Sequence, residues 1–245
     1  MTITDGIEML ELDMDVWGQK SIIYPTLIWD KNNVVLVDAG MPSNLSAIMS
    51  YLEKISNRAD NLTVVVTHQD LDHIAGLPEL IRTYERCVNV LAHEEEKPYI
   101  EGKRPLIKVN PDRINKLFAS FPEEHRVKML AVANKPPKCP VDRTVIDGEE
   151  LPWCGGIIVI HTPGHTPGHI CLYHKRSKTL IAGDALIAHE GILLPPIAQA
   201  TFDMDLALQS LKKLTRYDIE YVICYHGGLC KGAMNQRIAE IASSS

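Results

Sequence analysis

The chain has 245 residues, 45% of them hydrophobic, and a formal net charge of −6. This length suits a single α/β domain with a large core, and a negative charge without a basic run disfavours a nucleic-acid partner. No apolar run approaches the roughly 20 residues that span a bilayer, so we expect no membrane partner. The N-terminus lacks the basic and apolar stretches of a signal peptide, and the six cysteines form no Cys-x-x-Cys pair; both favour a cytoplasmic protein with reduced thiols.

The first forty residues predict the start of a sheet. Residues 7–38 are strand-like, and the apolar segments Ser21–Trp29 and Val34–Val37 are joined by Asp30–Asn33, whose composition is typical of a hairpin turn. The second segment is followed at once by Asp38, which places a carboxylate at the end of an apolar strand.

A helix should follow. Between residues 43 and 55 the apolar side chains recur at helical spacing, and Ser43 is available as the N-cap. We expect this helix to cover one face of the sheet. We expect Trp17 and Trp29 to be packing residues rather than contacts of a cofactor.

The segment Thr67-His68-Gln69-Asp70-Leu71-Asp72-His73 lies between a strand-like and a helix-like run and carries four side chains that can bind metal. His68 and Asp70 alternate, so they lie on one side of an extended chain, whereas Asp72 and His73 are adjacent and point in different directions on a turn. Burying such groups unpaired costs roughly several kcal/mol per charge unless a cation holds them. The segment therefore predicts a corner that could serve two metal ions.

The helix after this corner should extend to about Tyr84, and Cys87–Ala92 should form the next strand. His93 follows that strand and precedes an acidic run. We expect it to be solvated and do not count it as a metal ligand.

Residues 93–140 differ from the rest of the chain in charge, because they hold ten of the 25 basic residues and seven of the 31 acidic ones. Seven prolines divide the segment, which predicts short helices and loops inserted between two halves of the fold. Such an insertion is either a surface excursion or a lid over the site. As a lid, it would offer an apolar wall from Tyr99, Phe118 and Phe121 and basic side chains to attract an anionic substrate.

Three later segments again place His or Asp where an apolar strand meets a turn containing glycine. They are His161-Thr-Pro-Gly-His165-Thr-Pro-Gly-His169, Ile181-Ala-Gly-Asp184 and Tyr221-Val-Ile-Cys-Tyr-His226-Gly-Gly. Ligands at the ends of separate strands can converge on one edge of a sheet. The Pro-rich loop Leu193–Ala198 should lie beside Asp184, where it either lines a substrate pocket or packs on the surface. Asp203 should cap a helix, and a last helix should span about 231–242.

These motifs, in this order, resemble those of the metallo-β-lactamase superfamily of hydrolases. Its members carry His-x-His-x-Asp-His, then single His, Asp and His ligands, and an Asp that ends an early strand. The resemblance covers nearly the whole chain. It implies an α+β fold, a four-layer αββα sandwich, in a single domain over residues 1–245 with the insertion at about 93–140.

The resemblance also implies a dinuclear metal site at one edge of the sandwich. The first ion would be held by His68, Asp70 and His165, the second by Asp72, His73 and His226, with Asp184 bridging both. Asp38 would orient the site, and His161 and His169 would be structural. The chain departs from the family at Asp70, where most members have His. We expect two divalent ions, zinc first of all, with iron or manganese as alternatives at the site containing Asp70.

The activity implied is hydrolysis of a small ester, thioester or lactone by a hydroxide held between two metal ions, with Asp72 accepting the proton of the attacking water. The alternative is an iron-dependent redox enzyme of the same fold, an oxygenase or a diiron-type enzyme, which the acidic residue at position 70 favours. A non-catalytic metal-binding module fits the complete ligand set less well. A small-molecule substrate is expected, and the sequence leaves open whether the protein forms a homodimer.

Overall fold

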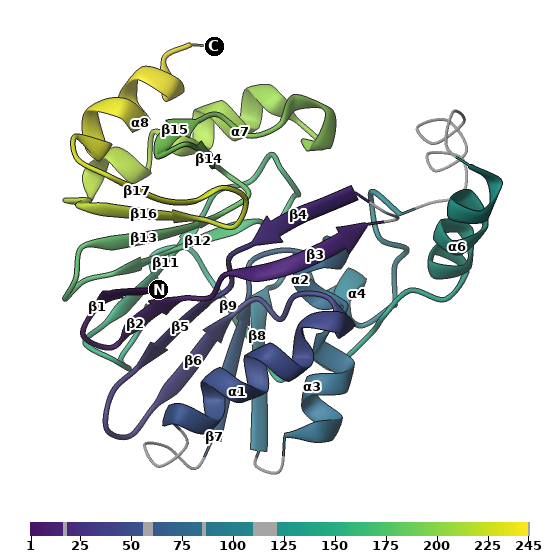
Figure 1. Cartoon of the computed structure of the whole chain (residues 1–245). Coiled ribbons are helices and arrows are strands. Elements are labelled where there is room, and N and C mark those ends of the chain that lie inside the picture. Colours follow the sequence, from purple (N-terminus) through teal and green to yellow (C-terminus); the bar gives the residue numbers. More distant parts are fainter. Residues whose placement is uncertain (17–18, 56–60, 85–86, 110–121, 245) are drawn as a thin grey trace.

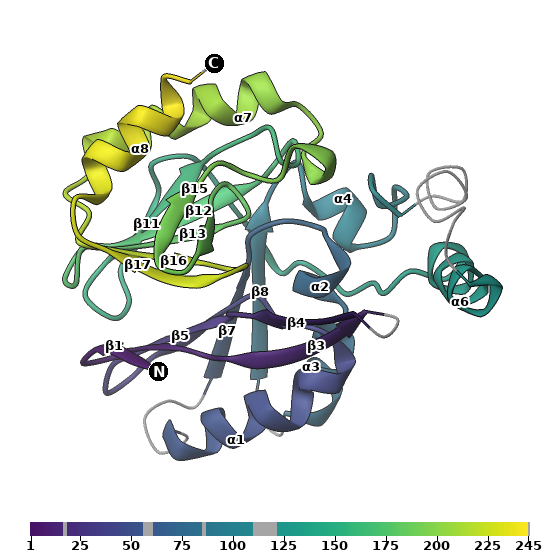
Figure 2. The ribbon, with the colours of Figure 1, turned by 45° about the horizontal axis from the view of Figure 1, so that its top comes forward.

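The protein is a four-layer sandwich of two sheets covered by helices on their outer faces (Figures 1 and 2). The computed structural model describes residues 1–16, 19–55, 61–84, 87–109 and 122–244. Trp17, Phe118 and Phe121, to which the sequence assigned roles, lie outside the described residues.

The first sheet has seven strands in the order β1-β2-β5-β6-β7-β8-β9, and β6, β7, β8 and β9 run parallel to one another. Its strands are β1 (Thr2–Thr4), β2 (Ile7–Met9), β5 (Thr26–Trp29), β6 (Val34–Val37), β7 (Asn61–Val66), β8 (Cys87–His93) and β9 (Arg143–Val145). A separate hairpin of β3 (Leu12–Val16) and β4 (Gln19–Ile23) stands beside it.

The second sheet has six strands in the order β10-β11-β12-β13-β16-β17, with β13 and β16 parallel. They are β10 (Glu150–Leu151), β11 (Ile157–His161), β12 (Ile170–His174), β13 (Thr179–Gly183), β16 (Tyr221–Cys224) and β17 (Gly228–Lys231). A short hairpin of β14 (Ile187–His189) and β15 (Ile192–Leu194) follows β13.

Alternation along the strands builds three layers of core. On β6, Val35 and Val37 face the second sheet, whereas Val34 and Leu36 face the helices. Helices α1 (Leu45–Ile55) and α3 (Leu77–Thr83) cover the first sheet, and α7 (Met204–Leu211) and α8 (Met234–Ala242) cover the second. Strands buried on both faces explain the continuous apolar runs of the sequence.

Two predicted elements are divided in the structure. The predicted strand Ser21–Trp29 breaks into β4 and β5 at Pro25, which has no N–H for a ladder. The predicted helix to Tyr84 breaks into α2 (Leu71–Ile74) and α3. It breaks at Gly76, where an added Cβ would lie 2.4 Å from the carbonyl oxygen of Ala39.

The start of α1 also differs from the prediction. A 3₁₀ turn, Pro42–Asn44, precedes it, so Ser43 lies inside this turn and is not the N-cap. The side chain of Asn44 instead accepts a hydrogen bond of 2.9 Å from the N–H of Met41. The cap predicted at Asp203 is confirmed, since its carboxylate accepts the N–H of Leu206. Trp29 is buried in the core as expected.

The insertion contains α4 (Lys97–Ile100) and α6 (Glu123–Asn134), and α6 stands away from the sandwich (Figure 1). Among the described helices, none combines the length and apolar character needed to span a bilayer. The prediction that His93 is solvated is wrong. Its side chain is buried, and its ring stacks on that of His161 with 4.0 Å between the ring centroids.

Candidate metal centre

The structure brings the seven predicted ligands together at one edge of the sandwich. The motif residues follow β7, His165 lies in the loop between β11 and β12, Asp184 follows β13, and His226 follows β16. Because β13 and β16 are parallel, Asp184 and His226 leave the second sheet at the same edge. The two sheets thus present their ligands to each other across this edge.

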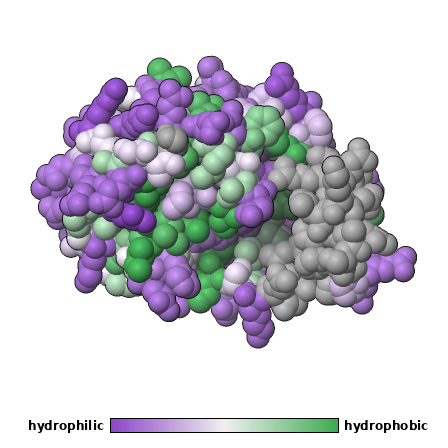
Figure 3. Space-filling model, turned by 90° about the horizontal axis from the view of Figure 1, so that it is seen from above, coloured by the Kyte–Doolittle hydropathy of each residue, from purple (hydrophilic) through white to green (hydrophobic). Residues whose placement is uncertain are grey.

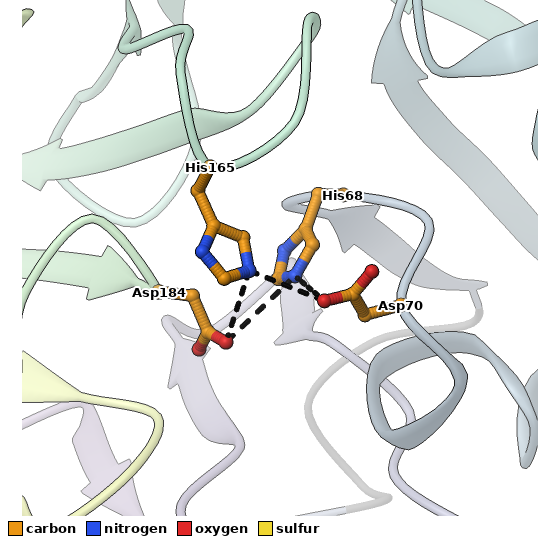
Figure 4. Close-up of side chains that lie close together, drawn as sticks. All are labelled: His68, Asp70, His165 and Asp184. Carbon is orange, nitrogen blue, oxygen red and sulfur yellow. Dashed lines mark hydrogen bonds and ion pairs between the residues drawn. The ribbon is translucent and has the colours of Figure 1, made fainter. Parts of the chain in front are cut away.

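Four ligand atoms form the first cluster (Figure 4). Asp70 Oδ2 lies 3.3 Å from His68 Nε2 and 3.1 Å from His165 Nε2. Asp184 Oδ2 lies 3.9 Å from His68 Nε2 and 3.3 Å from His165 Nε2. Ligands at about 2.0–2.2 Å from a tetrahedral ion stand about 3.3–3.6 Å apart. The spacings of 3.1–3.9 Å in this cluster are close to that range, so the four atoms could surround one metal ion.

The second cluster contains Asp72, His73 and His226. Asp72 Oδ2 lies 3.2 Å from His226 Nε2 and 3.8 Å from His73 Nε2. Asp184 reaches this cluster too, with Oδ1 at 3.4 Å from His73 Nε2 and Oδ2 at 3.5 Å from His226 Nε2. Asp184 therefore stands between the two clusters, where a bridging carboxylate would stand.

Three of these ligand atoms are buried without a hydrogen-bond partner, namely His68 Nε2, His73 Nε2 and Asp184 Oδ1. Buried polar atoms are normally satisfied, and a cation in each cluster would satisfy them, since His68 belongs to the first cluster and His73 to the second. The residues present therefore fit a metal centre.

Charge in the clusters favours a cation as well. Burial would lower the pKa of His226, yet the carboxylates of Asp184 and Asp72 raise that pKa to about 10. Burial and the neighbouring His73 lower the pKa of His68 to about 4, which keeps its imidazole neutral, as a metal ligand must be.

Asp38 fixes the ring of His73. Its Oδ2 lies 2.8 Å from His73 Nδ1 and accepts the hydroxyl of Thr67, and its Oδ1 accepts the N–H of Thr67. A carboxylate can only accept, so His73 carries its proton on Nδ1 and turns the Nε2 lone pair toward the cluster. This is the orienting role the resemblance implies for Asp38.

His169 and His161 support the loop between β11 and β12. Nε2 of His169 accepts the N–H of Asp184 at 3.0 Å, and its Nδ1 lies 2.9 Å from the hydroxyl of Thr162. His161 Nε2 lies 2.9 Å from the carbonyl oxygen of Pro167. Their contacts are those of structural residues.

Sequence reasoning missed two residues of the insertion. Glu96 is fully buried, and it accepts the N–H of Gln69 at 2.9 Å and the N–H of Gly168 at 2.7 Å. The ammonium of Lys108 pairs with Asp70 and lies 2.6 Å from His165 Nε2. Neither position stands out among the charged residues of this segment, so no local signal could have found them.

A cavity of about 220 Å³ opens on the clusters and is also lined by Ile187, Ile197 and Ala200. Ile197 belongs to the Pro-rich loop, so this loop lines the cavity rather than only packing on the surface.

Large apolar side chains nearby in the chain are also exposed, including Phe202 and Leu206. Figure 3 shows apolar atoms among hydrophilic ones on the face that carries α7. Tyr99, predicted as part of an apolar wall, packs against the core instead.

A model of the metallo-β-lactamase superfamily matches residues 20–226. The probable metallo-hydrolase YflN of Bacillus subtilis is 30% identical over 210 residues, or 81% of this chain and 76% of that protein. The atrochrysone carboxyl ACP thioesterase of Aspergillus fumigatus is 21% identical over 73% of this chain and 42% of its own length.

A crystal structure of a metallo-β-lactamase family protein from Thermus thermophilus has the same fold. Its TM-score is 0.69 at 22% identity, over 99% of this chain and 80% of that one. The family match covers most of the chain and includes every residue of both clusters. The chain belongs to the metallo-β-lactamase superfamily.

Proposed function

We propose that the protein hydrolyses a small ester, thioester or lactone at a centre of two divalent metal ions. Zinc is the first choice, with iron or manganese as alternatives at the cluster containing Asp70. The observation that carries this proposal is the pair of ligand clusters, joined by Asp184, opening on a partly apolar cavity. The thioesterase among the relatives supports it. The six free cysteines are consistent with a reducing compartment, and we propose the cytoplasm.

Bound ions would supply a hydroxide nucleophile at neutral pH and positive charge opposite the carbonyl oxygen of the substrate. Within the described part of the chain, the cavity is lined by no Ser or Cys that could act as a nucleophile instead. The apolar side chains of Ile187, Ile197 and Ala200 suit the acyl part of a substrate.

Asp72 is the residue we assign to proton transfer. Its carboxylate lines the cavity and contacts His226. Its backbone is held by α2 and by a hydrogen bond from the Tyr225 hydroxyl to its carbonyl oxygen. A carboxylate fixed in this way can accept the proton of the attacking water and deliver it to the leaving group.

The test is a panel of esters, thioesters, lactones, phosphodiesters and lactams, assayed with protein loaded with zinc, iron or manganese. We expect one of the first three classes to be hydrolysed. At saturating metal, Asp72→Asn should lower kcat by roughly 10²–10⁴-fold, as loss of a general base does. Asp205→Asn, on an exposed turn of α7, is the matched control and should leave kcat unchanged.

No hydrolysis with any metal would overturn the proposal. O₂ consumption by the iron-loaded protein, without hydrolysis, would favour the redox alternative. The observation in its favour is the first cluster's donor set of two imidazoles and two carboxylates, which suits iron as well as zinc.

A further inference from the structure

Lys108 is built into the first cluster. Its side chain is 13% exposed, and its ammonium pairs with Asp70 Oδ2 and lies 2.6 Å from His165 Nε2. The preceding residue is anchored to the metal-binding motif, since the N–H of Ile107 donates to the side chain of Gln69 at 2.8 Å. The backbone therefore presents Lys108 to the cluster.

Lys108 and a metal ion cannot both use His165. An imidazole Nε2 has one lone pair, which either accepts a hydrogen from the ammonium or binds an ion. Two cations only a few Å apart also repel each other. An ion can enter the first cluster only if the ammonium leaves.

The second cluster has no such occupant. Within the described residues, no Lys or Arg forms an ion pair with Asp72 or Asp184, whose partners there are histidines. The ligand atoms His73 Nε2 and Asp184 Oδ1 are buried and unpartnered. An ion can bind here without displacing a Lys or Arg side chain.

Asp70 explains why the ammonium is held at the first cluster. Family members with His at this position have a neutral ligand, whereas Asp70 adds a negative charge that Lys108 balances. A buried ammonium without such a partner would be costly. The departure from the family motif and the lysine of the insertion therefore act as a pair.

We propose that Lys108 competes with metal for the first cluster, so that the two clusters fill in order. The ion at Asp72, His73 and His226 binds first and tightly. The ion at His68, Asp70 and His165 binds second, and more weakly, because it must displace the Lys108 ammonium. This inference rests on the proposed metal-dependent function of the same site.

The test is a titration of metal-free protein with Zn²⁺ in competition with a chromophoric chelator, with bound zinc counted after gel filtration. For the unmodified protein we expect a tight step and a second step at least about tenfold weaker, a difference of about 1.4 kcal/mol. Lys108→Met should tighten the second step at least about tenfold and leave the first unchanged. Lys103→Met is the matched control, since Lys103 lies in the same insertion, is 70% exposed and pairs with Glu101.

Two indistinguishable steps in the unmodified protein would overturn the inference, and so would a second step that Lys108→Met leaves as weak as before. The titration of the unmodified protein does not depend on how the variant folds. Ordered zinc binding without hydrolysis of any panel substrate would sink the proposed function and leave this inference standing. Hydrolysis by a protein that binds zinc equally well in both clusters would support the proposed function and overturn the ordered filling.

Discussion

Replacing Asp38 by Asn should weaken metal binding at the second cluster through the tautomer of His73. Asp38 is 1% exposed, and its carboxylate accepts hydrogen bonds from the N–H and hydroxyl of Thr67 and from His73 Nδ1. Its φ is 62°, in the left-handed region that Asn tolerates, so the variant should keep the backbone conformation.

The Asn side chain has only one acceptor oxygen, whereas the carboxylate of Asp38 has two for its contacts with Thr67 and His73. If the oxygen faces the N–H of Thr67, the amide NH₂ faces His73, and Nδ1 must accept. The proton of the imidazole then moves to Nε2, the atom that should bind the ion. If the amide is turned the other way, two N–H groups oppose each other at Thr67. Either arrangement loses charge-assisted hydrogen bonds, which contribute about 1.5–3 kcal/mol each.

We expect Asp38→Asn to weaken zinc binding at the second cluster by about 10–100-fold, the usual effect of losing such a partner, or about 1.4–2.7 kcal/mol. The same chelator competition measures this, with urea unfolding of the metal-free protein alongside. Asp30→Asn is the control, because Asp30 also accepts backbone N–H groups, from Asn32, Asn33 and Cys154, at the other end of β6. It should lower stability but not zinc affinity. An Asp38→Asn variant that binds zinc as tightly as the parent would refute the tautomer argument.

Three more predictions concern stability. Removing metal with a chelator should lower the Tm, since an ion at 100 times its Kd stabilises by about 2.7 kcal/mol. Burial, together with the stacked His161, lowers the pKa of His93 to about 4, so protonation of the unfolded chain should erode stability as pH falls from 6.5 to 4. His93→Gln should flatten that decline in urea midpoint. Gly227→Ala should lower the Tm more than Gly191→Ala. At Gly227 the φ is 94° and an added Cβ would lie 1.7 Å from the carbonyl oxygen of Ala188, whereas Gly191 has a positive φ but open space and should lose only about 1–3 kcal/mol to strain.

Each of these has a contrary result. An unchanged Tm after chelation would mean that no ion contributes to folding. An equally steep pH dependence in His93→Gln would place the titration elsewhere. Equal losses at Gly227 and Gly191 would show that the chain absorbs the contact with Ala188 by a small shift.

The sequence was most informative where chemistry and local pattern coincide. Asp184 and His226 each follow an apolar strand, and strand ends converge by the geometry of a parallel pair, so their meeting was predictable. The break at Gly76 was harder to place, because it depends on the carbonyl oxygen of Ala39, which lies against it from an earlier part of the chain. The position of His93 depends on His161, 68 residues away in the chain, and no local pattern encodes such a partner.

Glu96 makes the insertion part of the framework that holds the metal ligands. Its carboxylate joins Gln69 of the motif after β7 to Gly168 of the loop that carries His165, so it ties the ligands of the two sheets at a fixed spacing. An added Cβ at Gly168 would lie within about 3 Å of Glu96, which leaves this junction little room to vary. Loop exchanges intended to change substrate preference should therefore keep the segment from Glu96 to Lys108. Exchanges confined to the stretch beyond Lys108 would leave the tie intact, whereas exchanges that begin before Glu96 would let the two halves of the ligand set drift apart.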